Sequence, residues 1–160
     1  MKNYFFKDEN INENDLYFVC YMIECVARIL KQKNSYVVNK IGYEELFKKI
    51  SLADVLHCEN PKKIIHDWIE EYHLAEGNYD IKNVNKNLVD EIPAETQMGK
   101  VYKRLILQTL DEEENYVDAI IRIYNSSICS IIDNYNTSAY YTPSYILRQA
   151  YYADSFNAIN

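Results

Sequence analysis

The amino-acid sequence predicts an all-α protein, a compact bundle of five to seven helices around one central buried helix, in a single domain spanning residues 1–160. Three observations support this class. Apolar residues make up 48% of the chain and recur at helical spacing in most segments. Glycine and proline number only three each, too few for an all-β fold with many tight turns. No alternation of strands with helices is visible, which argues against a βαβ architecture.

The central helix is expected within residues 15–33, where the helical pattern is clearest. Its main apolar row follows the i, i+3, i+4, i+7 rule and comprises Leu16, Val19, Cys20, Ile23, Val26, Ala27 and Leu30. A second apolar row adds Phe18, Met22, Cys25 and Ile29. The remaining polar stripe is narrow and consists of Tyr17, Tyr21, Glu24, Arg28 and Lys31. A helix that is apolar over most of its circumference must be surrounded, so we place it at the centre, with Asp15 as its N-cap.

Two further helices are expected in the first half of the chain. Residues 35–50 carry a weaker apolar face, and Gly42 is expected to split this helix into two short pieces. Asn60 followed by Pro61 starts the next helix, because an Asn side chain accepts hydrogen bonds from free first-turn amides and Pro fits the first helical position. Gly77 lies just beyond the end of this helix and is its expected C-cap.

Residues 78–96 form the one long segment without a helical pattern. Four apolar side chains are expected to hold it against the core: Ile81, Val84, Leu88 and Ile92. A connection of this length inside a compact domain is unusual and is often functional. The sequence leaves open whether residues 78–95 join two sub-lobes, 15–77 and 96–155, or cross one undivided bundle.

Three helices are expected in the second half of the chain. The first covers residues 96–110, and a long helix follows at 112–135, with isoleucine and tyrosine at strict helical spacing. The acidic run at 111–114 suits the positive N-terminal end of that long helix. A Thr-Pro-Ser break then precedes a short helix at 144–153.

Charge and hydropathy restrict the compartment and the partners. The net charge is −7, so the chain lacks the positive field that attracts a phosphate backbone, and we expect no nucleic-acid partner. The N-terminus has no apolar signal region, and the longest apolar stretch is interrupted by Glu24 and Arg28, so we expect no membrane span and a cytoplasmic location. The four cysteines form no C-x-x-C pair and are expected to be reduced thiols: Cys20, Cys25, Cys58 and Cys129.

Motifs of catalysis and cofactor binding are missing, so we expect no catalytic residue, no cofactor and no metal. The chain lacks a nucleophile elbow, a P-loop, a dinucleotide fingerprint and an H-E-x-x-H helix. One group of imidazole and thiol residues matches no zinc template; it comprises His57, Cys58, His66 and His73. The acidic runs are expected on solvent-facing surfaces, and Asp118 and Arg122 are spaced as a surface ion pair.

The candidate site is a polar row on the predicted helix 112–135. Asn125, Cys129, Asp133 and Asn136 share one face, opposite the isoleucines. Half of the 16 tyrosines lie between residues 116 and 152, and Tyr is enriched at binding surfaces. The expected partner-binding residues are Asn125, Asp133, Asn136, Tyr140, Tyr141 and Tyr145. A biased base composition of the gene would explain the same Tyr and Asn excess without binding, and a small-molecule pocket is a further alternative.

The first half of the chain resembles a family of short, uncharacterised bacterial helical domains. The resemblance rests on three stretches: Leu16 to Glu24, Gly42 to Phe47 and Asp54 to His57. These match a helix of the form F-V-x-x-C-I-E, a short E-x-x-x-L-F helix and a D-V-L-H turn before a final helix. The match covers roughly residues 15–75 and implies no functional residues. Such domains are often encoded beside ADP-ribosyltransferase-like toxins, which implies an antitoxin or accessory role.

The sequence therefore favours a non-enzymatic, cytoplasmic protein-binding module, with an antitoxin or immunity partner of a basic toxin as the specific form. The acidic charge would steer such a chain towards a basic partner. The alternative is a small enzyme or binding protein that takes a polar or nucleotide-like ligand, through Asn125, Asp133, Asn136 and nearby tyrosines. That alternative requires these side chains to converge in a concave site with perturbed ionisation. Self-assembly into a structural protein is a third hypothesis.

Overall fold

Helix α1 (Glu13–Leu30) is the centre of the fold and is buried over most of its circumference. Its N-cap is Asn12 and not the expected Asp15. The Asn12 side chain accepts hydrogen bonds from the N–H groups of Asn14 and Asp15, and the Asp15 carboxylate accepts from the Asn12 N–H at 2.7 Å. The two residues thus form a capping box, in which Asp15 occupies the third helical position.

The computed structural model describes residues 1–153. Within this range the chain forms eight α-helices and one 3-10 helix and contains no β-strand. After α1 come α2 (Asn34–Ser51), α3 (Ala53–Leu56), α4 (Pro61–Glu71), α5 (Glu95–Thr109), α6 (Tyr116–Tyr124), α7 (Ser127–Ile132), η1 (Ala139–Tyr141) and α8 (Ser144–Ala153). The all-α bundle predicted from the sequence is confirmed.

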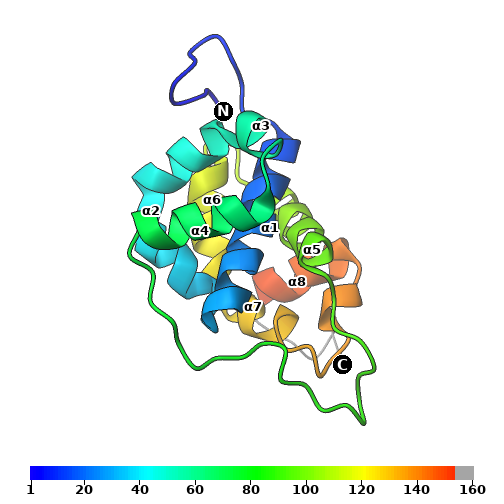
Figure 1. The fold of residues 1–160 in the computed structure, drawn as a ribbon. Helices are drawn as coiled ribbons and strands as arrows, with labels where there is room; N and C mark the ends of the chain where they lie inside the picture. Colours follow the sequence, from blue (N-terminus) through cyan, green and yellow to red (C-terminus); the bar gives the residue numbers. More distant parts are fainter. Residues whose placement is uncertain (154–160) are drawn as a thin grey trace.

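The other helices enclose α1, as its apolar circumference requires. Figure 1 shows α1 running through the middle of the molecule, with α2 and α5 on either side and α4 crossing it. Buried apolar side chains from both halves of the chain belong to one hydrophobic cluster, to which Trp68 and Tyr102 contribute fully buried rings. The core is therefore continuous across the two suggested sub-lobes. Residues 154 and 155 of the second sub-lobe lie outside the described residues.

Two glycines shape how the helices meet. Gly42 has φ 76° and interrupts α2, so the expected split is present. Gly99 lies where α5 crosses α1: a Cβ at this position would come within 3.0 Å of the Tyr21 Cβ atom. Since the obstructing atoms include the backbone of α1, a side chain at this position would force the two helices slightly apart.

The expected helix at 112–135 is two helices, because polar side chains divide it at Asn125 and Ser126. The Asn125 side chain donates to the Ile121 carbonyl at 2.8 Å, and the Ser126 hydroxyl donates to the Ile123 carbonyl. These bonds occupy the last carbonyls of α6 and compete with helix continuation. Helix α6 begins at Tyr116, with Asn115 as its N-cap. The acidic run 111–114 forms a turn before this helix and not its first residues.

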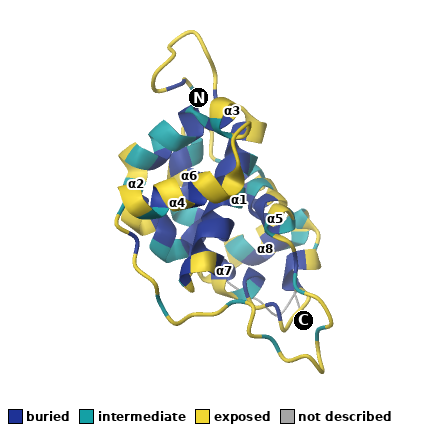
Figure 2. Ribbon diagram, viewed as in Figure 1, coloured by how far each residue is buried: buried dark blue, intermediate teal, exposed yellow. Residues whose placement is uncertain are grey.

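The connection between α4 and α5 lies along the outside of the bundle. Figure 1 shows it as a long green segment at the lower edge of the molecule, and Figure 2 shows that most of it is exposed. Three of the four expected anchors pack against the core, whereas Leu88 is 68% exposed. Gly77 does not cap α4, which ends at Glu71 with Tyr72 as its C-cap. Instead, the Gly77 N–H donates to the Leu30 carbonyl at 2.7 Å, and a Cβ would clash with Lys31 and Gln32.

Candidate functional site

The structure divides the six predicted site residues between separate places, and three of them, Asn136, Tyr140 and Tyr141, line a second pocket beside residues 88–90. Asn125 and Asp133 line one pocket between the first turn of α2, the α6–α7 break and the start of the connection. Asn136 and Tyr141 lie outside this pocket, because the chain turns away after α7. Tyr140 is buried, and Tyr145 is exposed on α8. The expected polar row does not continue along one helix, because α7 ends at Ile132, although Asp133 and Asn136 line a further pocket together with Tyr79.

The pocket has a volume of about 370 Å³, within the range of small-molecule sites. Its rim is exposed and includes Tyr79, Asn125 and Ser130. Its floor is formed by buried residues, of which Asn34 is 2% and Asp133 7% exposed. The remaining lining residues are Lys33, Ser35, Tyr124, Ser126 and Cys129.

Three hydrogen-bond donors, one each from α2, α5 and α7, hold the Asp133 carboxyl in the floor of the pocket. The Tyr102 hydroxyl donates to Oδ1 at 2.6 Å, Asn34 Nδ2 donates to Oδ2 at 3.1 Å, and the Cys129 thiol donates to Oδ2 at 3.3 Å. Burial, together with the nearby Glu24 carboxylate, nevertheless raises the pKa of Asp133 to about 7. The hydrogen bonds act in the opposite direction and do not offset the loss of hydration.

A second buried carboxylate, Glu24 on α1, lies behind Asp133 and is linked to it by Asn34. Asn34 Nδ2 donates to Glu24 Oε2 at 2.8 Å, while Arg28 Nε and the Tyr135 hydroxyl both donate to Glu24 Oε1. Arg28 also donates to the Pro93 carbonyl at 2.8 Å and to the Tyr135 hydroxyl at 3.0 Å. The network thus ties α1, α2, the end of the connection and the segment after α7 together.

Glu24 and Arg28 belong to the narrow polar stripe predicted on this helix, and the structure buries both of them. Glu24 is 1% exposed and Arg28 is 7% exposed. Burial alone would lower the pKa of Arg28, but the Glu24 charge and the Tyr135 hydroxyl outweigh it and raise that pKa. A signal was present: Glu24 and Arg28 are four residues apart on a helix that was expected to be surrounded, so their charges had to compensate each other inside the protein.

Two polar atoms in the pocket wall lack an ordinary hydrogen-bond partner among the described residues: Asn34 Oδ1 and the Tyr124 hydroxyl. The Tyr124 hydroxyl lies near the Cys20 thiol, a weak partner. The orientation of the Asn34 amide follows from its neighbours, since its Nδ2 faces two carboxyl oxygens. Buried polar atoms without a partner are rare in native structures, and both of these belong to residues that line the pocket.

The rim is ordered by contacts between distant segments. Asn39 of α2 and Asn125 form a reciprocal amide pair, at 2.8 and 2.9 Å. The Tyr79 N–H donates to the Lys31 carbonyl at 2.8 Å, which fixes Tyr79 at the end of α1. The Lys33 ammonium lies 5.5 Å from the centre of the Tyr79 ring, a cation–π distance.

The thiol in the pocket is not activated for nucleophilic chemistry. Burial, followed by the Asp133 charge, raises the pKa of Cys129 well above its usual value, so the thiol stays protonated near neutral pH. The pair formed by His57 and Cys58 lies elsewhere, exposed, with 3.6 Å between Nε2 and Sγ. Among residues 1–153, no group of three His, Cys, Asp or Glu side chains is arranged to hold a metal ion.

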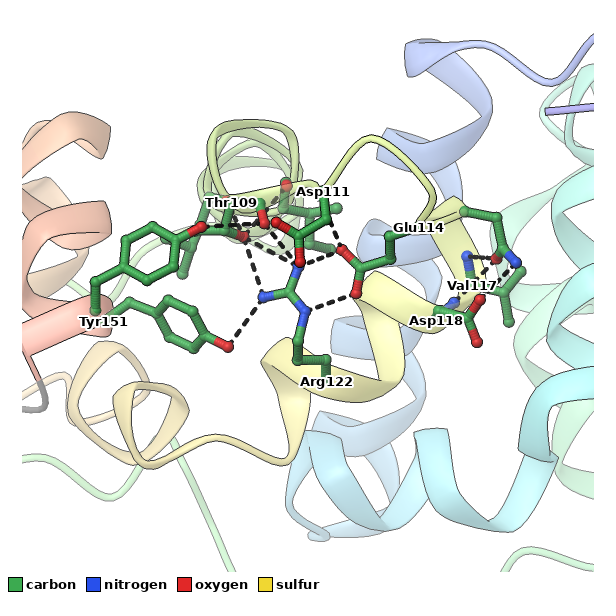
Figure 3. A network of polar contacts seen from close by, with 11 residues as sticks. Thr109, Asp111, Glu114, Val117, Asp118, Arg122 and Tyr151 are labelled. Carbon is green, nitrogen blue, oxygen red and sulfur yellow. Dashed lines mark hydrogen bonds and ion pairs between the residues drawn. The ribbon is translucent and has the colours of Figure 1, made fainter.

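A second polar cluster surrounds Arg122 and has a structural role (Figure 3). The guanidinium does not pair with Asp118 as expected. It donates to both oxygens of Glu114, at 2.7 and 2.6 Å, to the Tyr151 hydroxyl at 3.0 Å and to the last-turn carbonyl of Thr109 at 3.0 Å. It thereby fastens α8 and the end of α5 to α6, and its bond to Glu114 lowers the pKa of that carboxyl.

The C-terminal tyrosines are only partly available at the surface. Tyr140 packs edge-on against Tyr135, with 5.6 Å between ring centres, and is 6% exposed. Tyr141 and Tyr145 are 67% and 59% exposed. The four cysteines are free thiols as expected, although Cys58 is exposed and does not behave as a buried apolar residue.

Comparison of the chain with protein-family models, with curated proteins and with solved structures found no match. Across the described residues, no helix combines the length and the apolar character needed to cross a bilayer.

Proposed function

We propose that this chain is a cytoplasmic binding protein that takes a small polar ligand into the pocket over Asp133. One observation carries the proposal: Asn34, 2% exposed, has an unpartnered buried carbonyl oxygen and lines a pocket of about 370 Å³. A ligand donor would satisfy this acceptor, whose burial is otherwise unfavourable. The proposal corresponds to the alternative drawn from the sequence, with Asn136 removed from the site.

Binding is favoured over catalysis by the chemistry of the lining. The pocket contains one thiol, which stays protonated, and no imidazole that would activate it. Burial also raises the pKa values of the Tyr102 and Tyr124 hydroxyls well above the usual range, so both stay protonated near neutral pH, and that of Tyr102 donates to Asp133. Cytoplasmic location is supported by the free state of all four cysteines.

Blocking the pocket tests this function. A library of small polar metabolites is screened by ligand-observed NMR, with the intact chain and with Ser130→Trp, which fills the exposed rim. We expect at least one compound to bind with a micromolar to millimolar Kd, and Ser130→Trp to weaken it by at least about tenfold. Thr96→Trp, on an exposed position of α5 outside the pocket, is the matched control and should bind normally.

The outcome is decided by two results. Failure of every compound to bind the intact chain at millimolar concentration contradicts the function. Binding that persists in Ser130→Trp shows that the ligand lies elsewhere and contradicts the assignment of this pocket.

A second candidate function is the recognition of a protein partner through Tyr141 and Tyr145, with an antitoxin or immunity role towards a basic toxin as its specific form. The exposure of these two rings favours it, because large aromatic side chains that remain in solvent are typical of binding surfaces. The resemblance of residues 15–75 to helical domains encoded beside toxins supports the same candidate function. Tyr140 is not part of this face, since its ring is buried.

Co-expression with the product of the neighbouring gene tests the second candidate. We expect a complex that survives gel filtration at micromolar concentration, and Tyr141→Ala with Tyr145→Ala to weaken it by at least about tenfold without lowering the thermal stability. Tyr152→Ala is the matched control, because Tyr152 is 58% exposed outside this pair. If the complex forms equally well with both tyrosines replaced, Tyr141 and Tyr145 are not the binding surface. If no complex forms with the intact chain, the neighbouring gene product is not the partner.

A further inference from the structure

We propose that the ligand of this pocket is a small zwitterion, whose ammonium group contacts Asp133 and Asn34 and whose carboxylate faces Lys33 at the start of α2. The inference rests on the proposed function and names the chemical class of its ligand. It follows from the different chemistry of the two ends of the pocket.

The inner end offers acceptors and an unbalanced negative charge. Glu24 is neutralised by Arg28 at 2.9 Å, whereas Asp133 has no ion pair among the described residues. Arg28 cannot serve the ligand, because its donors are engaged by Glu24, the Pro93 carbonyl and Tyr135. The free acceptor beside Asp133 is Asn34 Oδ1. An ammonium group supplies the positive charge that this end lacks and a further donor for the free acceptor, and an anion would be repelled.

The outer end offers donors and positive charge. Helix α2 begins at Asn34, and its N-cap residue, Lys33, provides no side-chain acceptor for the first-turn amides. The N-terminal end of a helix carries a partial positive charge, to which the Lys33 ammonium adds a full one. Both Lys33 and Ser35 line the pocket. A carboxylate placed here would be stabilised by the N-terminal end of α2 and by Lys33. The inner and outer ends belong to one pocket, because Asn34 and Lys33 are adjacent and both line it.

Matched probes separate the two ends. Three compounds of equal chain length are titrated into the intact chain by calorimetry: 4-aminobutyrate, which has both groups, n-butylamine and butyrate. Glycine and 6-aminohexanoate extend the series to shorter and longer distances between the ammonium and carboxylate groups. We expect one of the zwitterions to bind at least about tenfold more tightly than n-butylamine, and butyrate to show no binding.

Two variants assign the groups. Asp133→Asn should weaken the zwitterion and n-butylamine together by at least about tenfold, because both lose the charge at the inner end. Lys33→Met should lower the affinity for the zwitterion to about that for n-butylamine and leave the affinity for n-butylamine unchanged. Lys40→Met, an exposed lysine of α2 outside the pocket, is the control.

The affinity for n-butylamine should also rise from about pH 6 to about pH 8, because the cation binds the ionised form of Asp133. The groups that face Asp133 from the surrounding elements are Glu24, Asn34, Tyr79, Tyr102 and Cys129.

The outcomes distinguish the ligand class from the function. If compounds of the metabolite library bind in the pocket but the zwitterions do not, the class is wrong and the function stands. If butyrate binds as well as n-butylamine, the assignment of the inner end is wrong. If Lys33→Met weakens both the zwitterion and n-butylamine equally, the assignment of the outer end is wrong.

Discussion

Replacing Arg28 with Met is expected to lower the free energy of unfolding by about 3–5 kcal/mol. The change leaves the Glu24 carboxylate, 1% exposed, without its compensating cation, and it removes the hydrogen bonds to the Pro93 carbonyl and Tyr135. Met fills a similar volume, so the loss reports the buried charge and not a cavity. A domain of this size has a total stability of roughly 5–15 kcal/mol, so the variant would lose a large part of it.

The double variant Glu24→Gln with Arg28→Met isolates the cause. Once both charges are absent, no unpaired ion remains buried, and we expect more than half of the lost stability to return. Arg28→Lys keeps the charge but not the planar donor group, and it should lie between the single variant and the intact chain. Arg28→Lys also provides a measurable protein if Arg28→Met does not fold.

Urea unfolding, followed by far-UV circular dichroism and by the fluorescence of the buried Trp68, measures these changes. Lys63→Met is the control, because it breaks two ion pairs, to Glu59 and Asp67, on a solvent-exposed surface. That variant should unfold at the same urea concentration as the intact chain. A loss below about 1 kcal/mol for Arg28→Met would show that the buried network does not hold the fold together.

The fold was predictable where the apolar pattern was decisive. The rows containing Leu16 and Ile23 left no broad solvent-facing side on α1, so its central position followed from the sequence. The break between α6 and α7 was not predictable from apolar spacing, because the isoleucines on either side keep the same period. It depends on Asn125 and Ser126, whose side chains compete for the final carbonyls of α6. Short-range side-chain bonds of this kind are invisible to hydrophobic periodicity.

The site was predictable only in part, because it depends on contacts between distant residues. Asn125 and Asp133 could be found as members of one helical row. Asn34 and Tyr79 could not, since they reach the pocket from segments that no local pattern relates to α7. The sequence marked Glu24 as part of a polar stripe on the central helix but did not indicate which groups this stripe would contact. On a surrounded helix such a stripe must face polar groups of its neighbours.

The stability of the protein is expected to fall as the pH rises from about 4 to about 7, and Asp133 is the cause. Burial, with the Glu24 charge as the next contribution, raises the pKa of Asp133 to about 7, whereas the same carboxyl in the unfolded chain titrates near its ordinary value of 3.8. Between these values the folded state retains a proton that the unfolded state has lost. The contribution of Asp133 to stability is therefore fully present below about pH 4 and is lost as the pH rises to about 7.

Asp133→Asn removes this titration and nearly preserves the shape of the side chain. At about pH 8 we expect the variant to be more stable than the intact chain by on the order of 2–4 kcal/mol, and this difference should shrink or reverse at about pH 4. The lowered pKa of Glu114 acts in the opposite sense in both proteins and cancels from their difference. Urea unfolding of the two proteins at several pH values measures the effect, with the exposed Asp67→Asn as the control. A constant difference across the pH range would mean that Asp133 has the same pKa in the folded and unfolded states. The affinity for n-butylamine should then not rise between about pH 6 and about pH 8.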